Sequence, residues 1–386
     1  MNHRSFGRRA CIQFLAPLVG ILAAGVAGAA DATLPPTVAV SIGVIAGADP
    51  IVTALAGALK KKFGTTLDMR LAATTGYTNV LPMVRDGQVT FAGNSVLAQP
   101  YAASEGLAPF DVPSWGPQRL GVVFACRMGV NSMATAADAN IRTFAALKGK
   151  RIALPPGNVP ALGTAYLAFG GLTWQDVVRV DAADAAEAVA AVVANRADAF
   201  ITAPTSTQAN ALAASPRGIF WPSTPAADTA GWQRLQKVTR WNERGMVAAA
   251  AGTAPGTSFE GASTLGVNFA AFLGRDGDLV YNLTKALFST YDDYKGAARG
   301  ATGCNVSQQT FDGYVPWHDG AIRYFKEIGV WTDAYQKAND QLMKRQGVVA
   351  DAWTKAKAGT YATDAEFRAA WLKTRAAALT AAGFEP

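Results

Sequence analysis

The sequence predicts an α/β protein built from two domains. Its 386 residues exceed what one hydrophobic core usually supports, and 50% of them are hydrophobic, enough to fill two cores. Short apolar runs typical of strands alternate with amphipathic segments typical of helices, which favours parallel sheets covered by helices. This alternation starts near residue 38 and again near residue 151, so we expect two similar units.

The first unit is predicted from three consecutive strand–loop–helix repeats. The expected strands cover residues 38–43, 67–72 and 89–93, and the helices that follow cover 51–63 and then end near 84 and 104. Asp49 is placed to cap the first helix. Pro50 suits the first helical position, because a backbone N–H has no partner inside the helix there.

The second unit is predicted from the same alternation. We expect strands at 130–134, 151–154, 177–180 and 197–202, with helices at 161–169, 184–195 and after 206. The chain then returns near 250–265, and a strand at 264–269 and helices at 281–291, 320–328, 332–345 and 364–382 pack back on the first unit. We therefore expect domain I to comprise residues 35–126 and 262–386, and domain II to comprise residues 130–250.

The first 29 residues are typical of a secretory signal peptide. Arg4, Arg8 and Arg9 precede a short apolar run at 14–26, and Ala27-Gly28-Ala29 is a small-residue cleavage site. The run is shorter than the ~20 apolar residues that a membrane span needs, and a retained membrane anchor is the alternative. A signal peptide implies export to the periplasm, where disulfides form.

Two cysteines, Cys126 and Cys304, remain after cleavage. They either form a bridge or stay as one buried thiol and one loop thiol. The sequence leaves both alternatives open, because it does not show whether the two Cα atoms approach closely enough for a disulfide.

The charge distribution argues against a nucleic-acid-binding protein. The formal net charge is +7, charged residues make up 16% of the chain, and the dense basic run is Lys60-Lys61-Lys62. We interpret this run as the solvated end of a helix, because nucleic-acid binding needs a longer basic stripe.

The sequence lacks the common catalytic and metal-binding motifs. His3 and His318 are its two histidines, and His3 leaves with the signal peptide. No Gly-x-Ser-x-Gly, CxxC, HExxH, P-loop or GxGxxG pattern is present. A hydrolase that uses His318 is the remaining catalytic alternative, and we expect no enzyme, no cofactor and no metal.

Five polar loops follow the carboxyl ends of predicted strands, where open α/β sheets bind their ligands. Their hydroxyls, amides and backbone N–H groups at helix N-termini suit an anionic group such as a carboxylate. The alternative is that these residues only cap helices. The candidate ligand-binding residues are Gly47, Asp49, Thr74, Thr75, Gly76, Tyr77, Asn94, Ser95, Gly157, Asn158, Thr164 and Thr205.

Larger side chains near these loops are further candidates. Arg70 and Arg127 lie near strand ends and could reach a carboxylate with two parallel hydrogen bonds, or could be ordinary surface residues. Tyr77 and Trp221 could stack on an aromatic ligand or simply pack at the edge of a cleft.

The most informative stretch is Pro316-Trp317-His318-Asp319-Gly320, which precedes a helix with Ile322, Phe325 and Ile328 on one face. Together with segments 147–153 and 280–287, it resembles the TAXI family of solute-binding proteins, which are extracytoplasmic receptors of one class of TRAP transporters. The resemblance covers about residues 38–330. It implies a type II periplasmic-binding-protein-like fold, with two α/β domains and a hinged ligand cleft, and a structural hydrogen bond for His318.

The resemblance also implies a function. Family members capture a small organic acid or amino acid and deliver it to TRAP membrane permease subunits for secondary-active uptake. The loops of this chain depart from the family pattern, since Asp49 stands where an aromatic residue is usual and Gly157-Asn158-Val159-Pro160 replaces Gly-Ser-Gly-Thr. These departures leave the ligand open. The alternative function is a sensory binding protein that feeds a signalling receptor.

Overall fold

The computed structural model describes most of the chain. The described residues are 38–45, 50–64, 67–74, 77–94, 98–129, 132–155, 159–298 and 300–386. The expected signal peptide at residues 1–29 lies outside them. Within the described part, no helix combines the length and the apolar character that crossing a bilayer requires.

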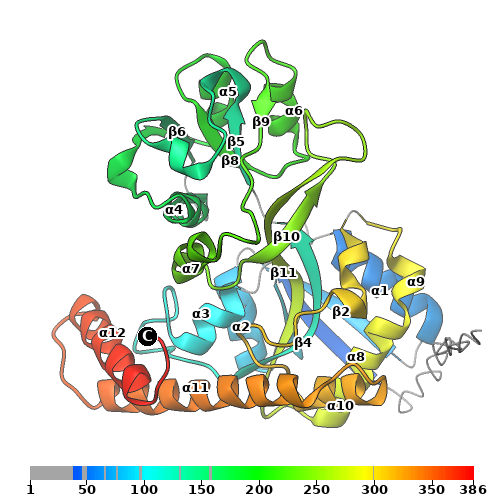
Figure 1. Cartoon of the computed structure of the whole chain (residues 1–386). Helices are drawn as coiled ribbons and strands as arrows, with labels where there is room; N and C mark the ends of the chain where they lie inside the picture. Colours follow the sequence, from blue (N-terminus) through cyan, green and yellow to red (C-terminus); the bar gives the residue numbers. More distant parts are fainter. Residues whose placement is uncertain are drawn as a thin grey trace, which may run out of the picture. The chain divides into compact units, whose positions relative to one another are not determined.

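The first sheet contains the predicted strands of the first unit (Figure 1). Its central parallel strands are β1 Val38–Ile45, β2 Leu67–Thr74 and β3 Phe91–Asn94, with β1 between the other two. The long strand β11 Ser258–Phe272 runs antiparallel beside β3 and also pairs with β4 Leu120–Gly129 and β10 Glu243–Ala248. The strand order is β10-β11-β3-β1-β2, with β4 joined to β11.

Helices α1 Pro50–Phe63, α2 Tyr77–Arg85 and α3 Ala98–Glu105 follow the three parallel strands as predicted. Helix α1 begins at Pro50, the position that proline favours. From the last third of the chain, α8 Gly277–Ser289, α9 Tyr291–Tyr294 and α10 Asp319–Glu327 pack on the same sheet. One core cluster joins them to the strands and is centred on large aromatic residues, among them Phe124, Phe269, Trp317 and Phe325.

The second sheet repeats the topology of the first. Its strands are β5 Ser132–Ala136, β6 Arg151–Leu154, β7 Val178–Asp181, β8 Ala199–Thr202 and β9 Ile219–Phe220, in the order β7-β6-β8-β5-β9. Strands β7, β6 and β8 are parallel, and β5 is antiparallel to β8. In both sheets the first parallel strand therefore lies between the second and the third, and an antiparallel strand follows. The prediction of two similar α/β units is confirmed.

The helices of the second unit are α4 Val159–Phe169, α5 Ala185–Val193, α6 Thr207–Ala213 and α7 Thr229–Val238. The first three match the sequence predictions. Helix α7 was not predicted, although Asp228 caps it and Trp232 and Leu235 form its buried face. Its short amphipathic pattern lies between prolines and a charged stretch, where a loop is an equally good interpretation.

The return from the second unit to the first is a β-hairpin rather than a loop. Strands β10 and β11 pair along six residue positions, from Glu243 with Ser263 to Ala248 with Ser258. Strand β11 is longer than the predicted 264–269. Strand β10 was missed because Glu243 to Ala248 contains a glycine and two charged residues and lies at a sheet edge, where polar residues are tolerated.

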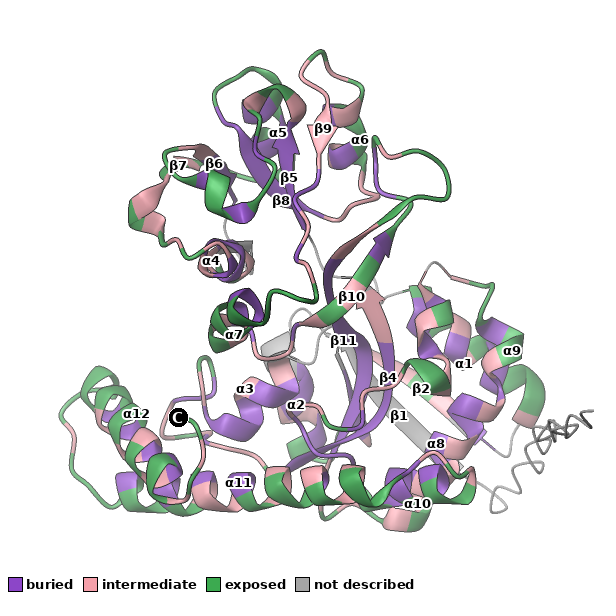
Figure 2. Ribbon diagram, viewed as in Figure 1, coloured by how far each residue is buried: buried purple, intermediate pink, exposed green. Residues whose placement is uncertain are grey.

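The chain ends in a pair of long helices, α11 Asp333–Lys357 and α12 Asp364–Ala381, with a small core of their own. Figure 2 shows both buried and exposed residues along each of these two helices. Helix α11 continues well beyond the predicted end at residue 345, through Gly347. Val349 and Trp353 pack against Phe367 and Trp371 of α12, and this tertiary packing outweighs the weak helix propensity of one glycine.

Candidate functional site

The carboxyl ends of the parallel strands line up in the first sheet. Ile45 at the end of β1 is the register partner of Thr74 at the end of β2, and Ile42 of β1 pairs with Phe91 of β3. Asn94, the last residue of β3, also pairs with Asn268 of β11. Loops that contain most of the predicted ligand-binding residues therefore leave the sheet from one edge, as ligand-binding loops of α/β sheets do.

The second sheet has the same arrangement. Leu154 at the end of β6 is the register partner of Asp181, and Ala153 pairs with Phe200 of the parallel strand β8. The loops after Leu154 and after Thr202 hence start at one edge of this sheet.

The structure describes only some of the predicted site residues. Gly47, Asp49, Thr75, Gly76, Ser95, Gly157 and Asn158 lie outside the described residues. Of Thr74, Tyr77 and Asn94 the backbone is placed, at the end of β2, the start of α2 and the end of β3.

The two predicted site residues with described side chains differ in their surroundings. Thr164 on α4 accepts a hydrogen bond from the indole nitrogen of Trp174 at 2.8 Å, which is a packing contact inside the second unit. Thr205, just after β8, lines a large cavity. Thr205 is therefore the predicted residue that the structure connects with a ligand-sized space.

This cavity has a volume of about 1290 Å³. Small-molecule sites usually measure about 300–1,000 Å³, so the cavity has room for a ligand and surrounding water. Most of its wall comes from four chain segments: the end of β4, the loop after β8, the whole of β10, and residues 300–312. The lining residues are Arg127, Met128, Ala203–Thr205, Glu243–Ala248, Ser263, Gly300, Thr302, Gly303, Gln308–Asp312, Tyr314 and Tyr335.

Arg127 is the central charged residue of the cavity wall. Its guanidinium forms an ion pair with Glu243 at 2.7 Å and donates to the hydroxyl of Ser263 at 2.9 Å and to the carbonyl oxygen of Gln308 at 3.0 Å. It also donates to the hydroxyl of Thr310, which in turn donates to Glu243 at 2.8 Å. Arg127 is thus more than an isolated surface arginine, because its partners come from β10, β11 and residues 308–310.

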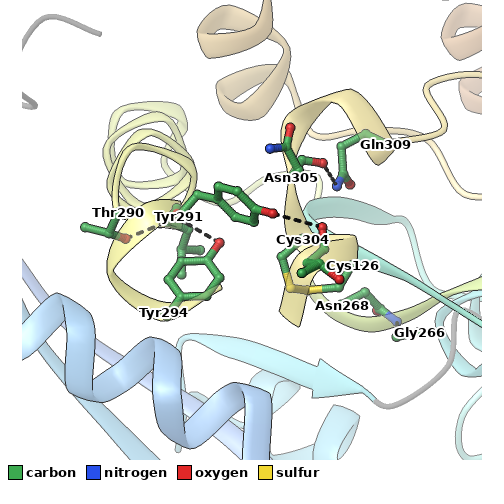
Figure 3. Close-up of a disulfide and its surroundings, with 11 residues drawn as sticks. Cys126, Gly266, Asn268, Thr290, Tyr291, Tyr294, Cys304, Asn305 and Gln309 are labelled. Carbon is green, nitrogen blue, oxygen red and sulfur yellow. Dashed lines mark hydrogen bonds between the residues drawn. A yellow bond between two sulfur atoms is a disulfide. The ribbon is translucent and has the colours of Figure 1, made fainter. Parts of the chain in front are cut away.

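A disulfide fastens the wall formed by residues 300–312 to β4. Cys126 and Cys304 are bonded, with Cα atoms 3.9 Å apart, so of the two alternatives the structure has the bridge (Figure 3). Gly303 lies so close to β4 that a Cβ atom there would be 1.8 Å from the carbonyl oxygen of Arg127. A glycine and a covalent bond therefore hold this wall against the strand that carries Arg127.

Further hydrogen bonds support the same wall. The hydroxyl of Tyr291 donates to the carbonyl oxygen of Thr302 at 3.2 Å, and the amide of Gln309 donates to the carbonyl oxygen of Asn305 at 2.9 Å (Figure 3). Residues 300–312 were not predicted to be part of the site. A usable signal was the cysteine between Gly303 and Asn305, because a bridge to Cys126 places this segment beside the end of β4.

Charges of both signs line the cavity. Arg127 and Arg244 face it together with Glu243 and Asp312. Burial, followed by the nearby charge of Glu243, raises the pKa of Tyr314 above its usual value. Tyr314 therefore stays protonated at neutral pH and can both donate and accept a hydrogen bond.

Trp221 does not face the cavity. It is buried, stacks on Phe259 and donates from its indole nitrogen to the carbonyl oxygen of Ala251 at 2.9 Å. Of its two predicted roles, the structure supports packing.

His318 has the structural hydrogen bond that was predicted. It caps α10, where its Nδ1 accepts from the backbone N–H of Gly320 at 3.1 Å. Burial lowers the pKa of His318, so the ring is neutral at physiological pH. His318 is absent from the cavity lining, and among the described residues no three His, Cys, Asp or Glu side chains are arranged to hold a metal ion.

Comparison with known protein families identifies the chain. The sequence model of the NMT1-like family matches residues 50–329. The chain belongs to the NMT1-like family. The match includes both sheets except β1, and every described cavity residue except Tyr335, whereas α11 and α12 lie beyond it.

Solved structures that match the chain include two binding proteins and a solute receptor. The aliphatic sulphonate binding protein SsuA from Escherichia coli is 14% identical, with 86% of this chain and 92% of that chain covered and a TM-score of 0.42. The probable amino-acid ABC transporter extracellular-binding protein YtmK from Bacillus subtilis is 12% identical, with 69% and 97% covered and a TM-score of 0.41. The L-cystine solute receptor of Neisseria gonorrhoeae is 14% identical, with 70% and 95% covered and a TM-score of 0.39.

A search of curated proteins found no match. The predicted fold class, an α/β fold of the type II periplasmic-binding-protein kind, is confirmed, and the shared strand order of the two sheets is its internal evidence.

Proposed function

We propose that this protein is an extracytoplasmic solute receptor of a TAXI-type TRAP transporter that captures a small organic acid or amino acid. The observation that carries the proposal is the cavity of about 1290 Å³ at the carboxyl edge of β8, between polar walls and beside strands that connect the two sheets. A binding receptor needs such a space and no covalent chemistry. In this proposal the domains are residues 35–126 with 262–386, and residues 130–250.

The chemistry of the walls favours a small polar ligand. Arg127 and Arg244 supply positive charge, Thr205 and Tyr314 supply hydroxyl groups, and Glu243 supplies an acceptor for an ammonium group. A ligand with a carboxylate and an ammonium group would find a partner for each end. The predicted loops with Asp49, Thr75 and Gly157 would complete the site from the strand ends described above.

The assignment to TRAP transport rests on the resemblance of segment 316–329. In the structure this segment is scaffold, since Trp317 is buried in the core and His318 caps α10. The partners would be TRAP permease subunits, the location would be the periplasm after removal of residues 1–29, and no nucleic acid, cofactor or metal would be involved.

The proposal can be tested with the purified mature protein. Small molecules released by denaturing it would be identified by mass spectrometry, and thermal unfolding would be followed against amino acids, dicarboxylates and aromatic acids. A ligand at 100 times its dissociation constant stabilises the native state by about 2.7 kcal/mol, so a true ligand raises the melting temperature.

The variant Thr205→Val, in the cavity wall, should weaken the response to the ligand. Thr229→Val, an exposed residue at the start of α7 that does not line the cavity, is the matched control. The absence of any released molecule together with unchanged melting across all three classes would contradict the proposal. Co-purification with a sensor kinase instead of a permease would favour the sensory alternative.

A further inference from the structure

The strands that pass from one sheet to the other are tied together at one level. Ser263 of β11 is the register partner of Glu243 on β10 and of Gly129 on β4, so the three strands lie side by side there. Arg127 of β4 joins the other two strands there, because it forms an ion pair with Glu243 of β10 and a hydrogen bond to Ser263 of β11. Thr310 joins from the cavity wall. We call Arg127, Glu243, Ser263 and Thr310 the hinge clasp.

The hinge clasp belongs to the first sheet. Arg127 follows Cys126, which is buried and bonded to Cys304 in the core of that sheet. Trp241, two residues before Glu243, packs on the same core and contacts Tyr101 of α3, with ring centres 6.1 Å apart. The ion pair is partly shielded from water, since the side chains of Arg127 and Glu243 are 24% and 16% exposed. Screening by solvent is therefore weaker here than for a surface pair.

Glycines occupy the next level toward the second sheet. Gly245 of β10 is the register partner of Gly261 of β11, two positions beyond Glu243 and Ser263. The hairpin is packed closely there, because a Cβ on Gly261 would lie 2.4 Å from Cγ2 of Val247. These two glycines face each other on neighbouring strands, and because they lack a Cβ atom they allow a wider range of backbone angles than other residues.

Beyond this glycine pair the hairpin packs on the core of the second unit. Val247, Ala250 and Ala251 lie in a core cluster with Phe200 and Trp221. The backbone N–H of Thr224 donates to the carbonyl oxygen of Glu260 at 2.8 Å, and that of Ala251 donates to Pro204 at 2.7 Å. The hairpin is thus fixed to one core on each side of the glycines.

We propose that Arg127 and Glu243 are positioning residues that lock the connecting strands to the first sheet, so that movement of the second sheet is confined to the glycine pair Gly245 and Gly261. Hinges are a few residues that absorb the change in backbone angles while the elements on both sides stay rigid. This proposal deepens the proposed function, because it places the bend of a ligand-closing motion directly at the cavity wall.

Two observations connect the clasp with the cavity. All four clasp residues line it, so the clasp also sets the position of β10 relative to residues 308–310. The cavity volume of about 1290 Å³ exceeds that of common small-molecule sites, so a motion that brings Thr205 toward the clasp would reduce it to the size of a ligand.

The test is backbone hydrogen exchange of the purified full mature chain, followed by mass spectrometry without any added ligand. In the unaltered protein, amides around Gly245 and Gly261 should exchange at least about tenfold faster than amides at 265–270, because local opening is easiest at the bend. Equal exchange rates in these two groups of amides would show that the bend does not lie at Gly245 and Gly261.

The variant Glu243→Gln removes the charge of the clasp while keeping its shape. Exchange should then rise about tenfold or more in peptides covering 121–129, 243–248 and 258–264, and stay unchanged in the core helix segment 280–288. Thr310→Val should give a smaller rise in the same peptides. The matched control is Glu327→Gln. It removes an ion pair of similar length, 2.8 Å, between Glu327 of α10 and Lys285 of α8.

Two results would overturn the proposal. One is unchanged exchange in the Glu243→Gln protein, and the other is a uniform rise over all peptides, which would show a loss of global stability only. Because no ligand is needed, failure of this test leaves the receptor proposal standing. Conversely, failure to find a ligand would leave the result of the exchange experiment on the hinge clasp unaffected.

Discussion

Two arginine–glutamate clusters in this molecule use the same chemistry in different surroundings. At the cavity, one arginine and one glutamate meet on connecting strands and remain partly exposed. At the C-terminal helices, Glu105 of α3 is held by Arg345 of α11 at 2.8 Å and by Arg375 of α12, and all three side chains are at most 9% exposed. The first cluster remains in contact with solvent, whereas the second is enclosed between helices.

The difference follows from what surrounds each charge. In the C-terminal cluster, burial by itself raises the pKa of Glu105, but the hydrogen bonds and charges of Arg345 and Arg375 outweigh burial and hold that pKa below its usual value. Both arginines make further bonds to backbone carbonyl oxygens, of Glu385 and of Glu105. A buried cluster with all groups bonded is costly to break, whereas a partly exposed pair costs less to open.

The largest effect should come from breaking the C-terminal cluster. Glu105→Gln leaves two buried arginines without a carboxylate, and we expect the free energy of unfolding to fall by about 3–5 kcal/mol. Urea unfolding followed by circular dichroism measures this. A loss below about 1 kcal/mol would contradict the view that this cluster is the rigid one of the two.

The second effect should come from the disulfide beside the cavity cluster. Replacing both Cys126 and Cys304 by serine removes a bridge that closes a loop of 178 residues. We expect a loss of about 2–5 kcal/mol, since a covalent closure restricts the unfolded chain. Urea unfolding of the variant and of the unaltered protein under reducing conditions should agree. If the variant were as stable as the oxidised protein, the bridge would not anchor the cavity wall.

The third effect should come from the cavity cluster itself. Glu243→Gln retains hydrogen-bonding groups and removes one charge of a partly exposed pair, so we expect a loss of about 1–2 kcal/mol. Measured by the same unfolding experiment, this loss should shrink in 1 M salt, because screening weakens the pair in the unaltered protein. A loss as large as that of Glu105→Gln would remove the distinction between the two clusters.

A smaller effect concerns His318 and the pH dependence of the protein's stability. Burial lowers the pKa of His318 in the folded protein below its value in the unfolded chain, near 6.5. The unfolded state therefore binds more protons in this range, and the contribution of His318 to stability is present above the unfolded pKa and is lost as the pH falls. His318→Asn keeps a side-chain cap for Gly320, so its stability between pH 7 and pH 5 should fall less steeply in thermal unfolding. Equal slopes would contradict this.

The smallest effect should come from an exposed pair that belongs to neither cluster. Asp181 is 81% exposed and contacts Arg179, which is 55% exposed. We expect Asp181→Asn to change neither the urea midpoint nor hydrogen exchange beyond experimental error. This variant is the reference for a carboxylate whose ion pair has no structural role.

Much of the fold could be predicted because its signals are local. The start of α1 at Pro50, the strands before α1, α2 and α3, and the repeat of the same order in the second unit all follow from patterns within a few residues. The structural role of His318 was predicted from the family resemblance, although its hydrogen bond to Gly320, two positions away, is itself local. In each case neighbouring residues decide the structure, and tertiary packing agrees with them.

The candidate site was less predictable. The predicted loops were chosen from strand ends, and of their residues Thr205 is the one that the structure places at the cavity. Arg127 was identified as a candidate without its partners. The wall at 300–312 and the edge strand β10 were missed, because glycines, threonines and glutamines without periodic pattern carry no signal for a sheet edge or a cavity wall.

The sequence by itself determined the α/β class, the two repeated units and the start of α1 at Pro50, because these depend on hydrophobic periodicity and on contacts within one helical turn. Tertiary structure alone decided the pairing of Cys126 with Cys304, the ion pair of Arg127 with Glu243, and the burial of Glu105 between α11 and α12. These partners are more than one hundred residues apart in the printed sequence. Their contacts exist because two folded sheets and the strands that connect them bring distant segments together, and no local propensity encodes such a distance.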